Sequence, residues 1–437
     1  MKNILFSLAF AFLLIPILPA QQKANSPFVK VNGTQLVLDN APYYFCGTNF
    51  WYGYYLGSKG ITGDRERLKR ELDQLVELGI NNLRILAASE ACEYDGTLKP
   101  AIQPSKGVYD EELLDGLDFL LAEMGKRKIY GVLFLNNFWQ WSGGMSQYVS
   151  WIDGSKLVDP TKGEWNKFYD YTSSFYSNQA ANELWHRYIH MLVNRENNYT
   201  GKLYKDDPTI MSWQLANEPR GGEGMNGMKN IESFYRWVDQ SAAYIHSLDN
   251  NHLVSSGSEG TIGTKGNTEI FEKAYQSKNI DYLTFHLWAK NWGWFNAQKY
   301  AETVKTSKTK AAKYITDHIE LARKMGKPIV LEEFGLDRDL AKCMPGTPTT
   351  ARDEYYQHIF NLIAESAKTN SPLMGSNFWG WAGEAIPASA DGKVIATSPF
   401  LADPWQEPQG LNSVFKSDTS TVSIIKEHAE KMKGMGK

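Results

Sequence analysis

Short apolar runs alternate with longer amphipathic segments along most of the chain. Eight of these runs predict β-strands, at Tyr43–Asn49, Asn82–Leu86, Ile129–Asn136, Ile210–Asn217, His252–Gly257, Asp281–Trp288, Pro328–Phe334 and Leu373–Trp381. Strands that alternate with helices form parallel sheets, and eight strand–helix units match a closed (β/α)8 TIM barrel. A doubly wound open sheet is the alternative arrangement for the same alternation.

The segments between the predicted strands carry apolar residues at helical spacing. Leu68 and Leu72, for example, lie on one face of a predicted helix that ends at Gly79. We interpret such stripes as core packing. Outside the barrel, Phe28–Asp39 predicts an N-terminal β-hairpin placed to plug the barrel floor, and Thr421–Lys433 predicts a closing amphipathic helix.

The longest stretch between predicted elements follows the third strand, from Asn137 to about Asn178. It is rich in aromatic residues, which include Trp139, Trp141 and Trp165. Active sites of (β/α)8 barrels lie on the loops that follow the strands. We therefore expect a long, ordered, aromatic-rich loop that contributes to function.

The chain begins with a segment typical of a secretory signal peptide. Lys2 supplies a basic start, Ile4–Leu18 an apolar stretch, and Ala20 a small residue at the expected cleavage point. Residues 1–20 are thus predicted to be removed on export, which would make the protein extracellular or periplasmic. Residues 21–437 are predicted to form one catalytic domain.

A membrane anchor is the alternative interpretation of the apolar start. Pro16 and Pro19 interrupt the run, however, and a spanning helix needs about 20 apolar residues. No second segment is long enough, so we expect no membrane contact after removal of the signal. The net charge of −3, without blocks of Lys or Arg, argues against nucleic acid as a partner.

Two further features of the composition bear on function. The three cysteines, Cys46, Cys92 and Cys343, allow one disulfide at most and leave at least one free thiol. The 14 tryptophans and 23 tyrosines exceed what core packing usually needs. Flat aromatic faces suit sugar rings, so a neutral carbohydrate is a fitting substrate.

Two glutamates supply the candidate chemistry, because each closes a strand-like run. Glu218 ends Trp213–Glu218 and precedes Pro219, and Glu333 lies in Ile329–Gly335. Glycoside hydrolysis needs one protonated carboxyl group and one ionised carboxylate beside the scissile bond. Strand alternation predicts that Glu332 and Glu333 point to opposite sides, so that only one of them serves the cleft.

These motifs resemble glycoside hydrolase family 5, in its endo-β-1,4-mannanase branch, over essentially the whole mature chain. The family motifs appear here as Asn217-Glu218-Pro219 and Glu333-Phe334-Gly335. The mannanase branch is indicated by the combination of Asn136-Asn137, Gly143-Gly144-Met145, Tyr148-Val149, Arg220 after Pro219, and Ser258-Glu259-Gly260.

The resemblance implies Glu218 as acid/base and Glu333 as nucleophile in a retaining mechanism. Arg84 matches the family arginine that orients the nucleophile, and Asn217 the residue that hydrogen-bonds the sugar 2-hydroxyl. A guanidinium beside Glu333 would keep it ionised and in place. The negative charge of Glu333 is expected in turn to raise the pKa of Glu218, which must begin the reaction protonated.

Further positions carry over from the resemblance as substrate-binding residues. Trp379 matches the aromatic platform beneath the sugar on the non-reducing side, although Trp381 shares its strand parity. His286 fits the family histidine. Many relatives have a tyrosine two residues later whose hydroxyl meets the nucleophile, whereas this chain has Trp288, which donates one N–H bond but cannot accept one. The remaining substrate-binding candidates are Arg220 and Glu259, on the leaving-group side, and Trp139.

We find no spacing typical of a metal site, a phosphate loop or a serine nucleophile elbow, and we expect no cofactor. The sequence therefore predicts a metal-independent, monomeric hydrolase of internal β-1,4-mannosidic bonds in mannan, galactomannan or glucomannan. Two alternatives stay open: a β-1,4-glucanase of the same family, and a non-catalytic carbohydrate-binding barrel.

Overall fold

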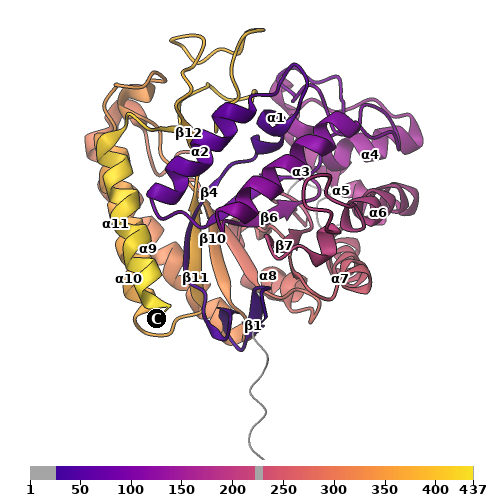
Figure 1. The fold of residues 1–437 in the computed structure, drawn as a ribbon, viewed down its shortest axis with the longest axis horizontal. Coiled ribbons are helices and arrows are strands. Elements are labelled where there is room, and N and C mark those ends of the chain that lie inside the picture. The colour runs from indigo at the N-terminus through magenta and orange to yellow at the C-terminus, as the bar shows by residue number, and fades with distance from the viewer. Residues whose placement is uncertain (1–25, 222–229, 437) are drawn as a thin grey trace, which may run out of the picture.

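The computed structural model describes residues 26–221 and 230–436 (Figure 1). The predicted signal peptide, residues 1–20, lies outside the described residues. Within them, we find no helix with the length and apolar character needed to cross a membrane. Cys46, Cys92 and Cys343 are all unpaired.

Eight parallel strands form the central sheet. They are β4 (Phe45–Asn49), β5 (Asn82–Leu86), β6 (Tyr130–Phe134), β7 (Ile210–Gln214), β8 (Leu253–Ser255), β9 (Leu283–Leu287), β10 (Ile329–Phe334) and β11 (Leu373–Phe378), in the spatial order β8-β7-β6-β5-β4-β11-β10-β9. A parallel bridge between Ser255 and Tyr282 joins the two ends of this order. The sheet is therefore closed, which confirms the predicted (β/α)8 barrel and excludes the open sheet.

The helices surround the barrel because each has one apolar stripe to bury. Leu68, Leu72 and Leu75, for example, are the buried positions of α2 that face the strands. The helices are α1 (Gly53–Gly57), α2 (Arg65–Glu77), α3 (Glu111–Lys126), α4 (Gly144–Asp153), α5 (Trp165–Ser173), α6 (Gln179–Val193), α7 (Ile231–Leu248), α8 (Thr268–Tyr275), α9 (Tyr300–Met325), α10 (Thr350–Ala367) and α11 (Thr419–Met435).

The chain ends close the barrel much as predicted. β1 (Lys30–Asn32), β2 (Gln35–Leu38) and β3 (Ala41–Pro42) form a three-stranded antiparallel sheet, one strand more than the expected hairpin. Hydrogen bonds from Lys30 to the Asn251 carbonyl (2.6 Å) and from Gln35 to the Ser371 carbonyl (3.1 Å) hold it under the strand starts. The predicted closing helix is α11, which lies beside α10 (Figure 1).

The segment Asn137–Asn178 is not the loop that we expected, because most of it is helical. It contains α4, α5 and short 3₁₀ turns. Its aromatic residues pack on one another; the rings of Trp139 and Phe168, for example, are stacked with an interplanar angle of 10°. The apolar spacing that encodes these short helices is too brief to separate them from an aromatic loop by pattern alone.

A second long connection, residues 384–412, joins β12 (Trp381–Gly383) and β13 (Val414–Phe415) at the same end of the barrel (Figure 1). We call this connection and Asn137–Asn178 the two irregular segments, because both depart from the regular strand–helix alternation of the barrel. Asp403 fixes it by accepting backbone N–H bonds from Gly410 and Asn412 at 2.9 and 3.0 Å. Both irregular segments thus stand over the carboxyl ends of the strands, where a barrel carries its site.

Candidate active site

A cavity of about 590 Å³ opens at the carboxyl ends of the strands. Its floor is formed by residues at strand ends, and its walls by the two irregular segments and the loops after β8 and β9. The lining residues are Trp139, Trp141, Trp165, Tyr169, Asn217, Glu218, Arg220, Glu259, Ile262, Trp288, Asn291, Trp292, Glu333, Trp379, Pro404, Gln406 and Glu407.

The two glutamates meet on the cavity floor, although 115 positions separate them in the chain. One carboxylate oxygen of Glu218 and one of Glu333 lie within 4.8 Å of each other. Retaining glycosidases place their two carboxyl groups about 5–5.5 Å apart, and inverting ones about 6.5–9.5 Å apart. A closest approach within 4.8 Å is nearer to the separation of retaining enzymes than to that of inverting ones.

Glu218 sits just beyond the end of β7. Its backbone has a φ of +48°, which is uncommon for a residue with a side chain. Its N–H donates to the Gly257 carbonyl at 2.9 Å, which ties it to the segment after β8. The turn thus presents the carboxylate to the cavity.

Glu333 is held by one donor on each oxygen. Arg84 Nη1 donates to Oε1 at 2.5 Å, and Trp288 Nε1 donates to Oε2 at 2.9 Å. The indole thus takes the hydrogen-bonding place that the resemblance gives to a tyrosine hydroxyl. Both contacts come from donors, and together they fix the orientation of the Glu333 carboxylate.

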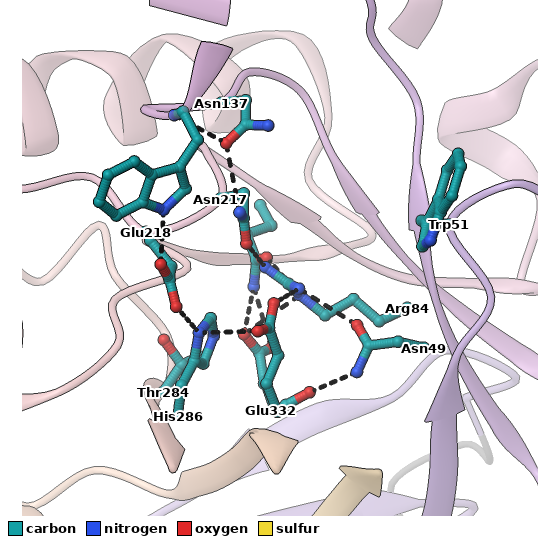
Figure 2. A network of polar contacts seen from close by, with 12 residues as sticks. Asn49, Trp51, Arg84, Asn137, Asn217, Glu218, Thr284, His286 and Glu332 are labelled. Atoms are coloured by element: carbon teal, nitrogen blue, oxygen red, sulfur yellow. Dashed lines mark hydrogen bonds and ion pairs between the residues drawn. The ribbon is translucent and has the colours of Figure 1, made fainter. Parts of the chain in front are cut away.

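Arg84 is the hub of the polar network that Figure 2 shows. Besides Glu333, its guanidinium donates to Gln214 Oε1 at 2.8 Å, Asn217 Oδ1 at 2.8 Å and Asn49 Oδ1 at 3.2 Å. These partners come from β4, β7 and the residues just after β7. Arg84 is fully buried, so the network fixes its orientation and, through it, that of Asn217 on the cavity floor.

Both oxygens of Glu218 also accept hydrogen bonds. His286 Nδ1 lies 2.6 Å from Oε1, and Trp139 Nε1 donates to Oε2 at 2.6 Å. Burial acts to raise the pKa of Glu218, but the hydrogen bond and charge of His286, with Arg220 and Trp139, outweigh it and hold the pKa below the ordinary value. The net rise in pKa that we expected for Glu218 is therefore not found in the free site.

His286 lies between the two carboxylates of the cavity floor. Burial acts to lower the pKa of His286, but the charges of Glu333 and Glu218 outweigh it and raise the pKa above the ordinary 6.5. Nδ1 lies 3.4 Å from Glu333 Oε2 as well, between the two carboxylates. His286 and Glu218 thus form a short hydrogen bond, across which a proton can be exchanged.

The structure separates the two tryptophans that strand parity left equivalent. Trp379 lines the cavity, and its ring meets that of Trp288 edge to face at 5.7 Å. Trp381 is buried behind it and donates Nε1–H to Glu71 Oε2 at 2.7 Å. Only Trp379 is placed to contact a ligand.

Arg220 and Glu259 form a two-pronged ion pair on another side of the cavity. Nε lies 2.5 Å from Oε1, and Nη2 lies 2.9 Å from Oε2. The guanidinium also stacks over the Trp139 ring at 4.8 Å. The pair thus braces the indole that donates to Glu218.

One prediction about the strand bearing Glu333 is wrong. Both Glu332 and Glu333 face the barrel interior, because Leu331 pairs with Phe285 and Glu333 with the next residue, His286. This bulge leaves Glu332 unpaired toward β9 and breaks the alternation of side chains. Of the two, only Glu333 reaches the cleft, as expected. The reason is that Glu332 lies below the cavity, and not that it points to the other side of the sheet.

Several cavity residues were not among the sequence candidates, most of them on the irregular segments: Trp165, Tyr169, Ile262, Asn291, Trp292, Gln406 and Glu407. Glu407 is a carboxylate without a hydrogen-bond partner among residues 26–221 and 230–436. Burial and nearby carboxylates raise its pKa to about 8. Nothing in the sequence around Pro404–Gln409 distinguishes it from a surface loop.

Glu218, His286 and Glu333 have their ligand atoms close enough to hold a metal ion. These atoms are already paired, Glu218 with His286, and Glu333 with Trp288 and the cation of Arg84. A guanidinium touching Glu333 opposes the binding of a second cation there. We therefore interpret the cluster as an acid–base group.

Comparison with known proteins agrees with this geometry. Residues 26–437 match the glycoside hydrolase family 5 β-mannosidase-like family. The chain belongs to this family. A mannan endo-1,4-β-mannosidase of Solanum lycopersicum is 30% identical over 394 residues, which span 87% of this chain and 90% of the relative. A putative mannan endo-1,4-β-mannosidase of Oryza sativa is 31% identical, with 88% and 89% coverage.

The family 5 mannosidase of Rhizomucor miehei has a similar solved structure. Its TM-score is 0.85 at 34% identity, with 94% of this chain and 98% of that chain covered. A mutant of the Rhizomucor miehei enzyme has been solved in complex with mannosyl-fructose. The shared family and barrel support a glycoside hydrolase.

Proposed function

We propose that this protein is an endo-acting hydrolase of β-1,4-mannosidic bonds that works by double displacement with retention. The observation that carries the proposal is the contact geometry of Glu218 and Glu333. Their oxygens lie within 4.8 Å, and each carboxylate has its own set of donors. The separation suits a nucleophile and an acid/base acting on one bond.

In the first step, Glu333 acts as the nucleophile and attacks the anomeric carbon of the sugar. The bond from that carbon to the glycosidic oxygen breaks, and its electron pair goes to the leaving oxygen. Glu218 protonates this oxygen. The proton comes to Glu218 from His286 Nδ1, 2.6 Å away, when the developing negative charge draws it forward.

In the second step, Glu218 is a carboxylate and acts as a base. It removes a proton from a water molecule whose oxygen attacks the anomeric carbon, and the ester bond to Glu333 breaks to regenerate the carboxylate. Two inversions at one carbon give net retention. The proton that Glu218 gains returns the Glu218–His286 pair to its starting state.

The remaining floor residues bind and position the sugar. Asn217 accepts a bond from Arg84 and donates one to Asn137, which fixes its amide at the cavity, where a sugar 2-hydroxyl would contact it. Trp379 offers a flat face on the non-reducing side, and Arg220, Glu259 and Trp139 lie on the leaving-group side. Trp288 holds the second oxygen of Glu333.

Mannan, galactomannan or glucomannan is the substrate class that the relatives favour, since several are mannan endo-1,4-β-mannosidases. An intact donor set around both carboxylates argues against a purely binding barrel, which has no need of a buried, paired nucleophile.

The test is reducing-sugar release and product sizing on galactomannan and on β-glucan, with Glu333→Ala as the inactive reference. We expect the wild type to release manno-oligosaccharides of several lengths and the variant to release none. Turnover of β-glucan alone would agree with the proposed mechanism but would identify β-glucan, and not mannan, as the substrate. Absence of turnover on both polymers would contradict the proposal.

We further propose that the protein is exported by cleavage after residue 20 and acts as a monomer. The apolar start and the small residue at position 20 support export. N-terminal sequencing of secreted protein is expected to begin at Gln21, and light scattering to give one subunit. A retained leader or a dimer mass would contradict these two points separately.

A further inference from the structure

The bulge in β10 places a second carboxylate directly beneath the nucleophile. The Glu332 side chain is about 1% exposed, and its Oε2 lies 3.6 Å from Arg84 Nε. Gln214 Nε2 donates to both of its oxygens, at 2.9 and 2.7 Å, while Gln214 Oε1 accepts from Arg84 Nε. Gln214 therefore bridges Glu332 and Arg84.

The network thus sets one buried cation against two buried carboxylates. Arg84 contacts Glu333 through Nη1 and approaches Glu332 through Nε, so different nitrogens of the guanidinium face the two acids. Removing one partner of a buried ion pair is costly when it leaves the other charge uncompensated. The proposed reaction of Glu333 with the sugar removes one partner charge of Arg84 in this way in every turnover.

When Glu333 forms an ester with the sugar, it loses its negative charge. Arg84, which is 0% exposed, would then be a buried cation without a counter-charge if Glu332 were absent. Burial raises the pKa of Glu332, and the charge of Glu333 adds to this effect. Esterification removes the second contribution, which favours ionised Glu332 at the stage when Arg84 needs it.

We propose that Glu332 is a positioning residue that supplies the counter-charge of Arg84 in the glycosyl-enzyme intermediate. This inference rests on the proposed role of Glu333 as nucleophile. Glu332 does not touch the sugar; it acts through Arg84, whose Nη2 continues to hold Asn217 at 2.8 Å. The intermediate and the transition states that lead to and from it are stabilised because Glu332 remains as the anion beside the Arg84 guanidinium.

The test is the rate at which an activated 2-deoxy-2-fluoro-β-mannoside labels the enzyme, followed by intact-mass and peptide mass spectrometry. The fluorine slows both steps, so the intermediate accumulates and its formation is measured directly. In Glu332→Gln, which keeps the shape and removes the charge, we expect labelling to be about tenfold slower or more. The labelled residue should still be Glu333.

A matched control separates charge compensation from general destabilisation. Asp118 is also buried, with its carboxylate 2.9 Å from Arg195 Nη2, but it lies on α3 away from the cavity. Asp118→Asn removes a comparable buried charge, and we expect it to lower thermal stability without slowing the labelling. Equal slowing in both variants would overturn the proposal.

The possible results distinguish this inference from the proposed function. Failure of the wild type to form an ester at Glu333 would overturn the proposed nucleophile. Labelling of wild type and Glu332→Gln at the same rate would overturn only the role of Glu332. Should Glu332→Gln not fold, Gln214→Leu, which removes the bridge and keeps both charges, is expected to slow labelling several-fold; an unchanged rate would contradict the inference.

Discussion

The floor and the walls of the cavity are built in different ways. On the floor, Arg84, Asn217 and Glu333 lie in strands or just after them, and Arg84 binds the other two directly. On the walls, residues such as Trp165 and Glu407 come from irregular segments and hold themselves by local packing. The floor is fixed by the register of the barrel, whereas the walls are free to differ among proteins of this fold.

This contrast assigns different kinetic roles to the two regions. Floor groups act on charge that changes during the reaction, so their loss should lower kcat. Wall groups contact sugar that stays unchanged, so their loss should raise KM with little change in kcat. Variants in each region therefore test whether the floor and the walls have these separate roles.

The largest effect is expected for Glu333→Gln. The amide keeps the contact with Arg84 but cannot form the ester, so kcat on mannotetraose should fall about 10⁴-fold or more. As a control, Glu123→Gln disrupts another Glu–Arg pair, with Arg127 at 2.6 Å, on α3. Its kcat should stay near wild type, and a comparable loss there would point to destabilisation instead.

The second effect is a shift in the pH profile of His286→Asn. The proton on the Glu218–His286 pair is present below the raised pKa of His286 and is lost as the pH rises through that pKa. The alkaline limb of kcat/KM should therefore lie above pH 6.5 in the wild type. Without the imidazole, the proton depends on a carboxyl group, whose ordinary pKa is 4.5, and the limb should move to lower pH.

His252→Asn is the matched control for this shift. His252 is also buried and has Nδ1 2.6 Å from a carboxylate, that of Asp249, but it lies below β8 and outside the cavity. We expect its alkaline limb to match that of the wild type. If the alkaline limb of kcat/KM does not move in His286→Asn, His286 does not supply the proton that Glu218 donates.

The smallest effect is expected on the wall, for Trp165→Ala. This ring is 45% exposed and lines the cavity without touching either glutamate in the described contacts. Loss of one aromatic contact is worth about 0.5–1.5 kcal/mol, so KM for a long manno-oligosaccharide should rise roughly 2- to 10-fold while kcat is kept. Tyr199→Ala, an exposed ring outside the cavity, should leave KM unchanged.

A fall in kcat for Trp165→Ala as large as that for a floor variant would break the distinction between the two regions. An unchanged KM for Trp165→Ala would show that this ring does not bind the sugar. Binding would then be restricted to the floor residues and to rings nearer the glutamates, such as Trp379.

The floor could be predicted from the sequence because its residues are tied to strand ends. Glu218 and Glu333 each close an apolar run, and the barrel brings strand ends to one face, so their meeting follows from the count of strands. Arg84 was identified through the family resemblance. Trp379 and Trp381 could not be separated, because the distinction depends on the contact of Trp381 with Glu71.

What could not be predicted depends on contacts between distant parts of the chain. Burial acts to raise the pKa of Glu218, and His286, which lies 68 positions away, lowers it; no local pattern encodes the bond between them. The inward direction of Glu332 depends on a bulge, which shifts the pairing by one residue. Glu407 reaches the cavity only because Asp403 folds its segment back over the barrel.

The most direct test of the account is the anomeric configuration of the first product. Hydrolysis of a manno-oligosaccharide, followed by ¹H NMR in the first minutes, distinguishes the β-anomer from the α-anomer before mutarotation mixes them. The close approach of Glu218 and Glu333, within 4.8 Å, predicts that the β-anomer appears first. Initial release of the α-anomer would mean inversion and would contradict the assigned roles of both glutamates.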